Sequence, residues 1–80
     1  MRLDKFLKVS RLIKRRTVAN DFAEAGRVSV NGKIAKPGTK LKIGDIISIT
    51  FGDQETKVIV KELNNAVKKE SAAQMYEIIS

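Results

Sequence analysis

The sequence predicts an α+β domain in which two N-terminal helices pack on a small antiparallel sheet, followed by a short helical tail at the C-terminus. Apolar residues recur at helical spacing over the first 25 residues, whereas from residue 27 they alternate with polar residues between turn dipeptides. A composition typical of helices returns at residue 67. Eighty residues suffice for one domain with a small core. We assign residues 1–64 to this domain and residues 65–80 to a tail that packs on it.

A basic connection at residues 11–16 separates the two predicted helices. The first spans residues 2 to about 10, and its apolar face comprises Leu3, Phe6, Leu7 and Ser10. The second is expected to begin near Thr17, whose hydroxyl can accept an amide hydrogen bond as N-cap. It is expected to end at Gly26 in a left-handed conformation.

Several stretches of alternating residues predict the sheet. Asn31-Gly32 is the strongest short signal for a hairpin and separates residues 27–30 from residues 33–35. Residues 40–43 and 47–51 alternate in the same way, and residues 57–61 are predicted to form another strand, with turns between these stretches. Residues 76–79 fit either an extension of the tail helix or a short strand, and the sequence leaves both open.

The residue types that are absent exclude several chemistries. The chain has no cysteine and no histidine, which excludes disulfides, zinc sites built from these residues, and any nucleophile activated by an imidazole. No apolar run is long enough to span a membrane, and the N-terminus has no signal-peptide pattern. We therefore expect a cytoplasmic, non-enzymatic protein that uses no cofactor and no metal.

Positive charge is concentrated in the first half of the chain, whose net charge overall is +7. The first block comprises Arg2, Lys5, Lys8, Arg11, Lys14, Arg15 and Arg16. The second block, residues 27–42, is basic and contains no acidic residue. Long cationic side chains clustered on one face suit the phosphates of a nucleic acid, because arginine can donate to two phosphate oxygens at once. The alternatives are a solvated helix face and an amphipathic helix lying on an anionic membrane.

Asp4 is the only acidic residue in the first block. It has no neighbouring acid or imidazole with which to perform catalysis. We expect it to accept hydrogen bonds from an arginine at the start of the second helix, such as Arg16, and to position that side chain. At the hairpin tip, Asn31 and Lys33 are expected to reach the nucleic acid as well.

The aromatic residues argue against recognition of splayed bases. Phe6, Phe22 and Phe51 each fall on an apolar face of a predicted element, which leaves only Tyr76 as a stacking platform. We therefore expect the protein to recognise the backbone shape and charge of a folded nucleic acid.

Residues 1–51 resemble the S-four RNA-binding domain, also called the alpha-L motif. The matching segments are Arg2–Leu7, Lys14–Thr17, Ala25–Gly32 and Lys42–Asp45. Residues 68–76 resemble the tail of a stand-alone bacterial group that includes a heat-shock RNA-binding protein and ribosome quality-control factors. The resemblance implies an adaptor in which Arg2, Asp4 and Arg16 matter most.

The same resemblance implies the partners. These are large-subunit rRNA, tRNA, and a large ribosomal subunit that still carries peptidyl-tRNA. There the protein would support the addition of alanines to stalled chains by a ribosome quality-control elongation factor. Away from the ribosome we expect a monomer with no membrane association. The alternatives are the targeting domain of an RNA-modifying enzyme and a general ribosome-associated heat-shock protein.

Overall fold

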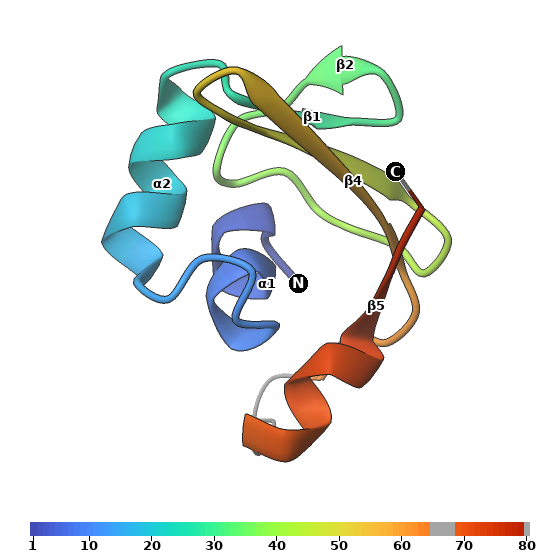
Figure 1. Ribbon diagram of the computed structural model, residues 1–80. Helices are drawn as coiled ribbons and strands as arrows, with labels where there is room; N and C mark the ends of the chain where they lie inside the picture. The colour runs from blue at the N-terminus through green and yellow to red at the C-terminus, as the bar shows by residue number, and fades with distance from the viewer. Residues whose placement is uncertain (65–68, 80) are drawn as a thin grey trace.

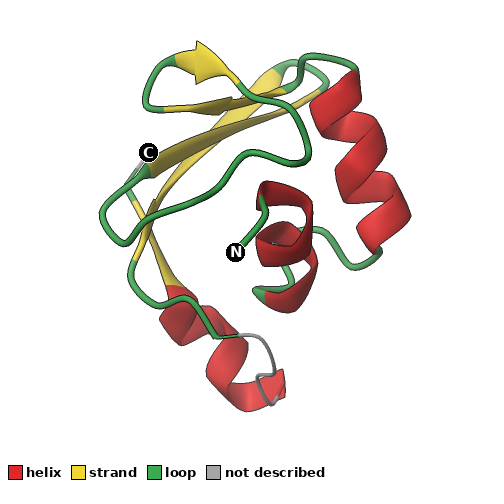
Figure 2. Ribbon diagram, turned by 180° about the vertical axis from the view of Figure 1, so that it is seen from behind, coloured by secondary structure: helices red, strands yellow, loops and turns green. Residues whose placement is uncertain are grey.

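The computed structural model describes residues 1–64 and 69–79. The elements are α1 (Leu3–Val9), α2 (Arg16–Glu24), β1 (Val28–Val30), β2 (Lys33–Ile34), β3 (Ile46–Phe51), β4 (Gln54–Val60), the 3-10 helix η1 (Lys69–Met75) and β5 (Tyr76–Ile78). The strands form one antiparallel sheet in the order β2-β1-β3-β4-β5. Both α-helices lie on the same side of this sheet (Figure 1, and from behind in Figure 2). The predicted arrangement of two helices packed on a small antiparallel sheet is confirmed.

The core lies between the two helices and the inner face of the sheet. Its buried side chains include Leu3, Phe6 and Leu7 of α1, Val28, Ile47, Ile49, Val58 and Val60 of the sheet, and Met75 of η1. From α2 only the small residues Ala19 and Ala23 are buried, and small side chains allow a helix to lie close to its neighbours. The small side chains therefore let α2 pack closely, and the site described below lies between the two helices.

Helix α1 ends where the chain turns left-handed at Arg11, with a φ of 64°. The Arg11 amide donates to the Lys8 carbonyl at 3.1 Å, and the Ile13 amide donates to the Leu7 carbonyl at 3.0 Å. A residue other than glycine in this conformation costs about 1 kcal/mol. Arg11 therefore stores a small amount of backbone strain.

Helix α2 begins at Arg16, one residue earlier than predicted. The N-cap residue is Arg15, which makes no side-chain capping hydrogen bond, so the N-cap role predicted for Thr17 is wrong. The last residue of the helix is Glu24, and Gly26 beyond it adopts the predicted left-handed conformation, with a φ of 75°. The amide of Arg27 donates to the Phe22 carbonyl at 3.0 Å and closes the helix end.

The predicted hairpin between β1 and β2 is present. Asn31 and Gly32 have φ values of 52° and 84°, which suit the two central positions of a tight hairpin turn. Val30 pairs with Lys33 across that turn.

Residues 40–43 do not form the predicted strand. Their one strand-like contact in the described part of the chain is an isolated bridge between Lys40 and Arg2. The amide of Leu41 donates to the Met1 carbonyl at 3.0 Å, and the Leu41 side chain is buried. The alternation therefore reflects a loop anchored to the N-terminus through one apolar residue, not a strand of the sheet.

The three phenylalanines differ in burial, contrary to the prediction. Phe6 is fully buried, whereas Phe22 is half-buried and Phe51 is 41% exposed. The rings of Phe22 and Phe51 lie 5.4 Å apart, and the Arg27 guanidinium lies 5.5 Å from the Phe22 ring centre. Phe51 is exposed because it is the last residue of β3, at the edge of the core.

The C-terminal segment is not a purely helical tail. Residues 65–68 and 80 of the predicted tail lie outside the described residues. Residues 69–75 form η1, and Tyr76–Ile78 form β5, which pairs with β4 at the sheet edge. The amide of Lys61 donates to the Met75 carbonyl at 2.8 Å. The sequence left open whether residues 76–79 form a helix or a strand. The structure shows a strand over residues 76–78.

Candidate nucleic-acid interface

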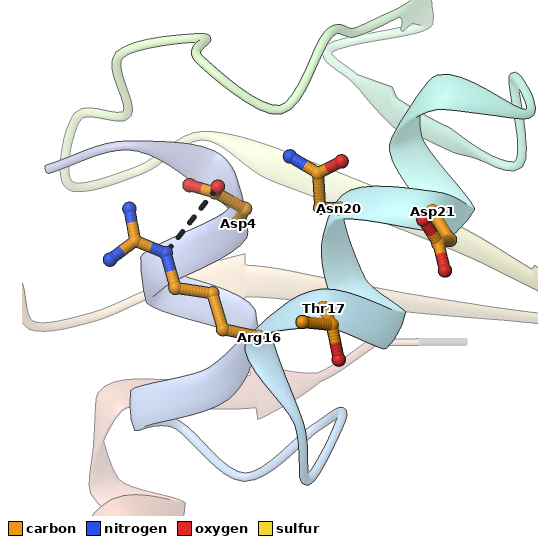
Figure 3. Close-up of a pocket in the computed structure, with 5 residues that line it drawn as sticks. All are labelled: Asp4, Arg16, Thr17, Asn20 and Asp21. Atoms are coloured by element: carbon orange, nitrogen blue, oxygen red, sulfur yellow. Dashed lines mark hydrogen bonds and ion pairs between the residues drawn. The ribbon is translucent and has the colours of Figure 1, made fainter.

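A buried carboxylate connects the two helices. Asp4 is 2% exposed. Its Oδ1 accepts hydrogen bonds from Arg2 Nε at 3.2 Å and from the Lys5 amide at 2.8 Å. Its Oδ2 accepts from Arg2 Nη2 at 3.3 Å and from Arg16 Nε at 3.4 Å. The contact between Asp4 and Arg16 that the sequence predicts is therefore present (Figure 3).

Both arginines that contact Asp4 keep donors in solvent. Their side chains are 54% exposed for Arg2 and 48% exposed for Arg16, against 4% for Asp4. Asp4 uses only the Nε of Arg16, and Figure 3 shows both Nη atoms beyond that contact, away from α2. This geometry presents oriented guanidinium donors to an external anion, and a phosphate can accept two such donors at once.

Opposing effects act on the pKa of Asp4. Burial raises the pKa of its carboxyl. The Arg16 hydrogen bond and charge, the Lys5 amide and the Arg2 charge outweigh the burial and hold the pKa below the ordinary value of 3.8. The carboxylate is therefore ionised at neutral pH and attracts both guanidinium groups.

The loop before β3 brings the second basic block beside the first. The amide of Leu3 donates to the Thr39 carbonyl at 2.8 Å, and the amide of Asp4 donates to the Pro37 carbonyl at 3.1 Å. Because Lys40 pairs with Arg2 in the isolated bridge, its exposed side chain lies next to that arginine. Residues distant in the sequence thus contribute to one positive surface.

The other residues of the first basic block are mostly in solvent. The exposed ones are Lys8, Arg11, Lys14 and Arg15, whereas Lys5 is half-buried. Lys5 and Lys8 belong to α1, and the rest belong to the connection before α2. Within residues 1–64 and 69–79, the ion pairs of the structure include none of these five. Their charges are therefore available to an external polyanion.

The Asn31 side chain is engaged within the protein. Its Nδ2 donates to Asp45 Oδ1 at 3.1 Å, and its Oδ1 accepts from the Ile46 amide at 3.0 Å. The Lys42 amide donates to Asp45 Oδ2 at 2.8 Å. We call these contacts the Asn31–Asp45 clamp. It fixes the loop of the second basic block to the hairpin, where Lys33 is exposed.

A hollow of about 290 Å³ opens beside Arg16. It is lined by Asp4, Arg16, Thr17, Asn20 and Asp21 (Figure 3). The sequence reasoning assigned no binding role to Thr17, Asn20 or Asp21. The sequence feature that points to these residues is a spacing of four, from Arg16 to Asn20 and from Thr17 to Asp21. This spacing places polar side chains on neighbouring parts of one helix surface.

Residues 1–64 and 69–79 contain neither a metal-binding cluster nor a membrane-spanning helix. No group of three or more His, Cys, Asp or Glu residues there is arranged to hold a metal ion. No helix there combines the length and the apolar character needed to cross a bilayer.

Residues 1–47 match the S4 domain family. The matched segment contains α1, α2, the hairpin and the loop of the second basic block, and so includes Asp4 and both of its arginines. The S4 domain is an RNA-binding domain. The match therefore defines the class of the protein, an RNA-binding protein.

Similar proteins cover the whole chain. The RQC P-site tRNA stabilizing factor of Streptococcus pneumoniae is 58% identical over 80 residues, which are 100% of this chain and 91% of the relative. The protein of the same name from Bacillus subtilis is 54% identical over 79 residues, 99% of this chain and 92% of the relative. The trimeric structure of Vibrio cholerae heat shock protein 15 matches with a TM-score of 0.91 and 32% identity, over 100% of this chain and 82% of that chain. The chain belongs to the S4 domain family and, within it, to the family of these stabilizing factors.

Proposed function

We propose that the protein is a cytoplasmic adaptor that binds rRNA and peptidyl-tRNA on obstructed large ribosomal subunits. There it supports ribosome-associated quality control, in which an elongation factor adds alanines to the C-terminus of a stalled chain. One observation carries the proposal: Asp4 orders the guanidinium groups of Arg2 and Arg16 within the S4 segment. The names of the relatives, which refer to a P-site tRNA, support it.

The ordered arginines explain how a small surface can bind RNA firmly. Immobilising a long side chain on binding costs about 0.5–1.5 kcal/mol. Asp4 holds Arg2 and Arg16 in place before the RNA arrives, so most of that cost falls on folding instead. Phosphate contacts position a protein on its nucleic acid and carry little sequence information. Specificity for an obstructed subunit then depends on the combined shape of rRNA and tRNA.

The proposed footprint extends from the ordered pair over the two basic blocks. Its phosphate-binding residues are Arg2, Lys5, Lys8, Arg11, Lys14, Arg15, Arg16 and Lys33. Asp4 acts as a positioning residue. Asn31 lies within the footprint and acts through the Asn31–Asp45 clamp, which keeps the hairpin and the neighbouring loop together. The protein acts as a monomer away from the ribosome.

Affinity isolation tests the proposal. Large ribosomal subunits are isolated from cells through a tag on this protein, and the recovered RNA is probed for peptidyl-tRNA. We expect large subunits that carry peptidyl-tRNA, together with a quality-control elongation factor. Recovery of free RNA alone, or of no ribosomal material, contradicts the proposal.

A pair of charge-reversed variants tests whether recovery of the subunits depends on the ordered arginines. Arg16→Glu reverses a charge at the ordered pair, and Lys57→Glu makes the same charge change on β4, where Lys57 pairs with Ser48 of β3. We expect Arg16→Glu to lose the subunits and Lys57→Glu to retain them. Equal recovery with both variants would exclude the ordered pair from the interface.

A further inference from the structure

The hollow beside Arg16 contains polar groups that phosphate binding does not use. Figure 3 shows Arg16 and Asn20 extending from α2 on the side of Asp4, with Thr17 and Asp21 one turn apart along the same helix. Asp4 is occupied by Arg2, Arg16 and the Lys5 amide. In the described part of the chain, the side chains of Asn20 and Asp21 take part in none of the hydrogen bonds or ion pairs.

The chemistry of the lining restricts the occupant. An ionised carboxylate such as Asp21 only accepts hydrogen bonds and repels a phosphate. The Asn20 amide and the Thr17 hydroxyl both donate and accept. The group that enters the hollow must therefore carry a hydrogen-bond donor for Asp21 and an acceptor for its neighbours, without negative charge.

The residues that line the hollow also indicate which part of a nucleotide can occupy it. Proteins that hold an unstacked base usually stack it on aromatic rings, and none of the described residues that line the hollow is aromatic. The 2′-hydroxyl of ribose is both a donor and an acceptor, and it is the group by which proteins distinguish RNA from DNA.

We propose that the hollow seats a ribose edge of the bound RNA, with Asp21 accepting a hydrogen bond from the 2′-hydroxyl and Thr17, four residues earlier on the same face of α2, donating to its oxygen. The inference rests on the proposed RNA binding by this face and adds a reason for selecting RNA. Arg16 borders both the hollow and the surface of ordered donors. One RNA strand that seats a ribose in the hollow would therefore also pass the surface of ordered donors.

A pair of RNA hairpins of one sequence tests this, one with natural ribose and one with 2′-fluoro ribose throughout. Fluorine removes the donor and preserves the A-form helix. Binding is measured by fluorescence anisotropy at low ionic strength, where a basic protein binds any RNA through its phosphates. We expect the natural hairpin to bind about tenfold more tightly, as for one hydrogen bond to a charged group.

Two variants that each remove one carboxylate from α2 control for charge. We expect Asp21→Ala to bind the two hairpins with about equal affinity. Glu24→Ala, on the same helix outside the hollow, should still bind the natural hairpin about tenfold more tightly. Equal binding of the two hairpins by the natural protein overturns the ribose proposal and leaves phosphate binding intact. So does a preference that survives Asp21→Ala. If neither hairpin binds at low salt, the proposed function fails as well.

Discussion

The two basic blocks of the chain carry charge of the same sign but are built differently. In the first, the buried Asp4 orders the cationic groups of Arg2 and Arg16 directly. In the second, the Asn31–Asp45 clamp holds only the backbone of the loop, and the side chain of Lys42 is exposed. The comparison indicates that the first block acts through fixed geometry and the second through net charge. The predictions below separate these two contributions.

The largest expected difference is between Arg16→Ala and Lys42→Ala, which each remove one positive charge. Loss of an ordered, charge-assisted contact should weaken binding to purified large subunits by about 10- to 100-fold. Loss of an exposed charge should weaken it by less than about fivefold. Equilibrium binding at one fixed salt concentration measures both. Equal losses would show that the two blocks act through charge alone.

Lowering the pH should remove the stabilisation that the Asp4 contacts in the first block give to the fold. Because the pKa of Asp4 is lower in the folded protein than its ordinary value of 3.8, ionised Asp4 stabilises the fold at neutral pH. That stabilisation should be lost as the pH falls below 3.8 and through the folded pKa. The free energy of unfolding of the natural protein should therefore approach that of Asp4→Asn in urea titrations at decreasing pH. A difference that does not change with pH would contradict the arginine contacts.

The smallest expected effect concerns Arg11 and has opposite signs for stability and binding. Arg11→Gly relieves the left-handed strain at a φ of 64°, which should stabilise the fold by about 1 kcal/mol, or about 4–8 °C in melting temperature. It should also reduce the salt dependence of RNA binding by about 0.7–0.9 of a logarithmic unit per tenfold change in salt. Arg11→Ala is the matched control, since it removes the same charge without relieving the backbone. Equal melting temperatures for the two variants would contradict the strain.

Local patterns predicted much of the fold. The Asn31-Gly32 turn, the glycine end of α2 and the apolar face of α1 each follow from a few adjacent residues. The alternation at residues 40–43 misled because Leu41 is held by the Met1 carbonyl, a contact between distant parts of the chain. The exposure of Phe51 likewise depends on where the core ends, which no local pattern contains.

The candidate site was predictable where charge and chemistry were unusual. A single acid among seven basic residues predicted the contact between Asp4 and Arg16. The position of Lys40 beside Arg2 requires the loop to return along the N-terminus. The hollow depends on the space between two packed helices, so the spacing of Asn20 and Asp21 alone did not predict it.

Asp4→Asn tests most directly whether geometry, rather than charge, makes the first block a binding site. The variant raises the net charge by one unit, keeps the side-chain size, and removes the carboxylate that orders Arg2 and Arg16. Its affinity for purified large subunits is measured beside that of the natural protein, with a thermal melt to verify folding. We predict that binding weakens by about tenfold despite the added positive charge. Unchanged or tighter binding by the folded variant would contradict the account.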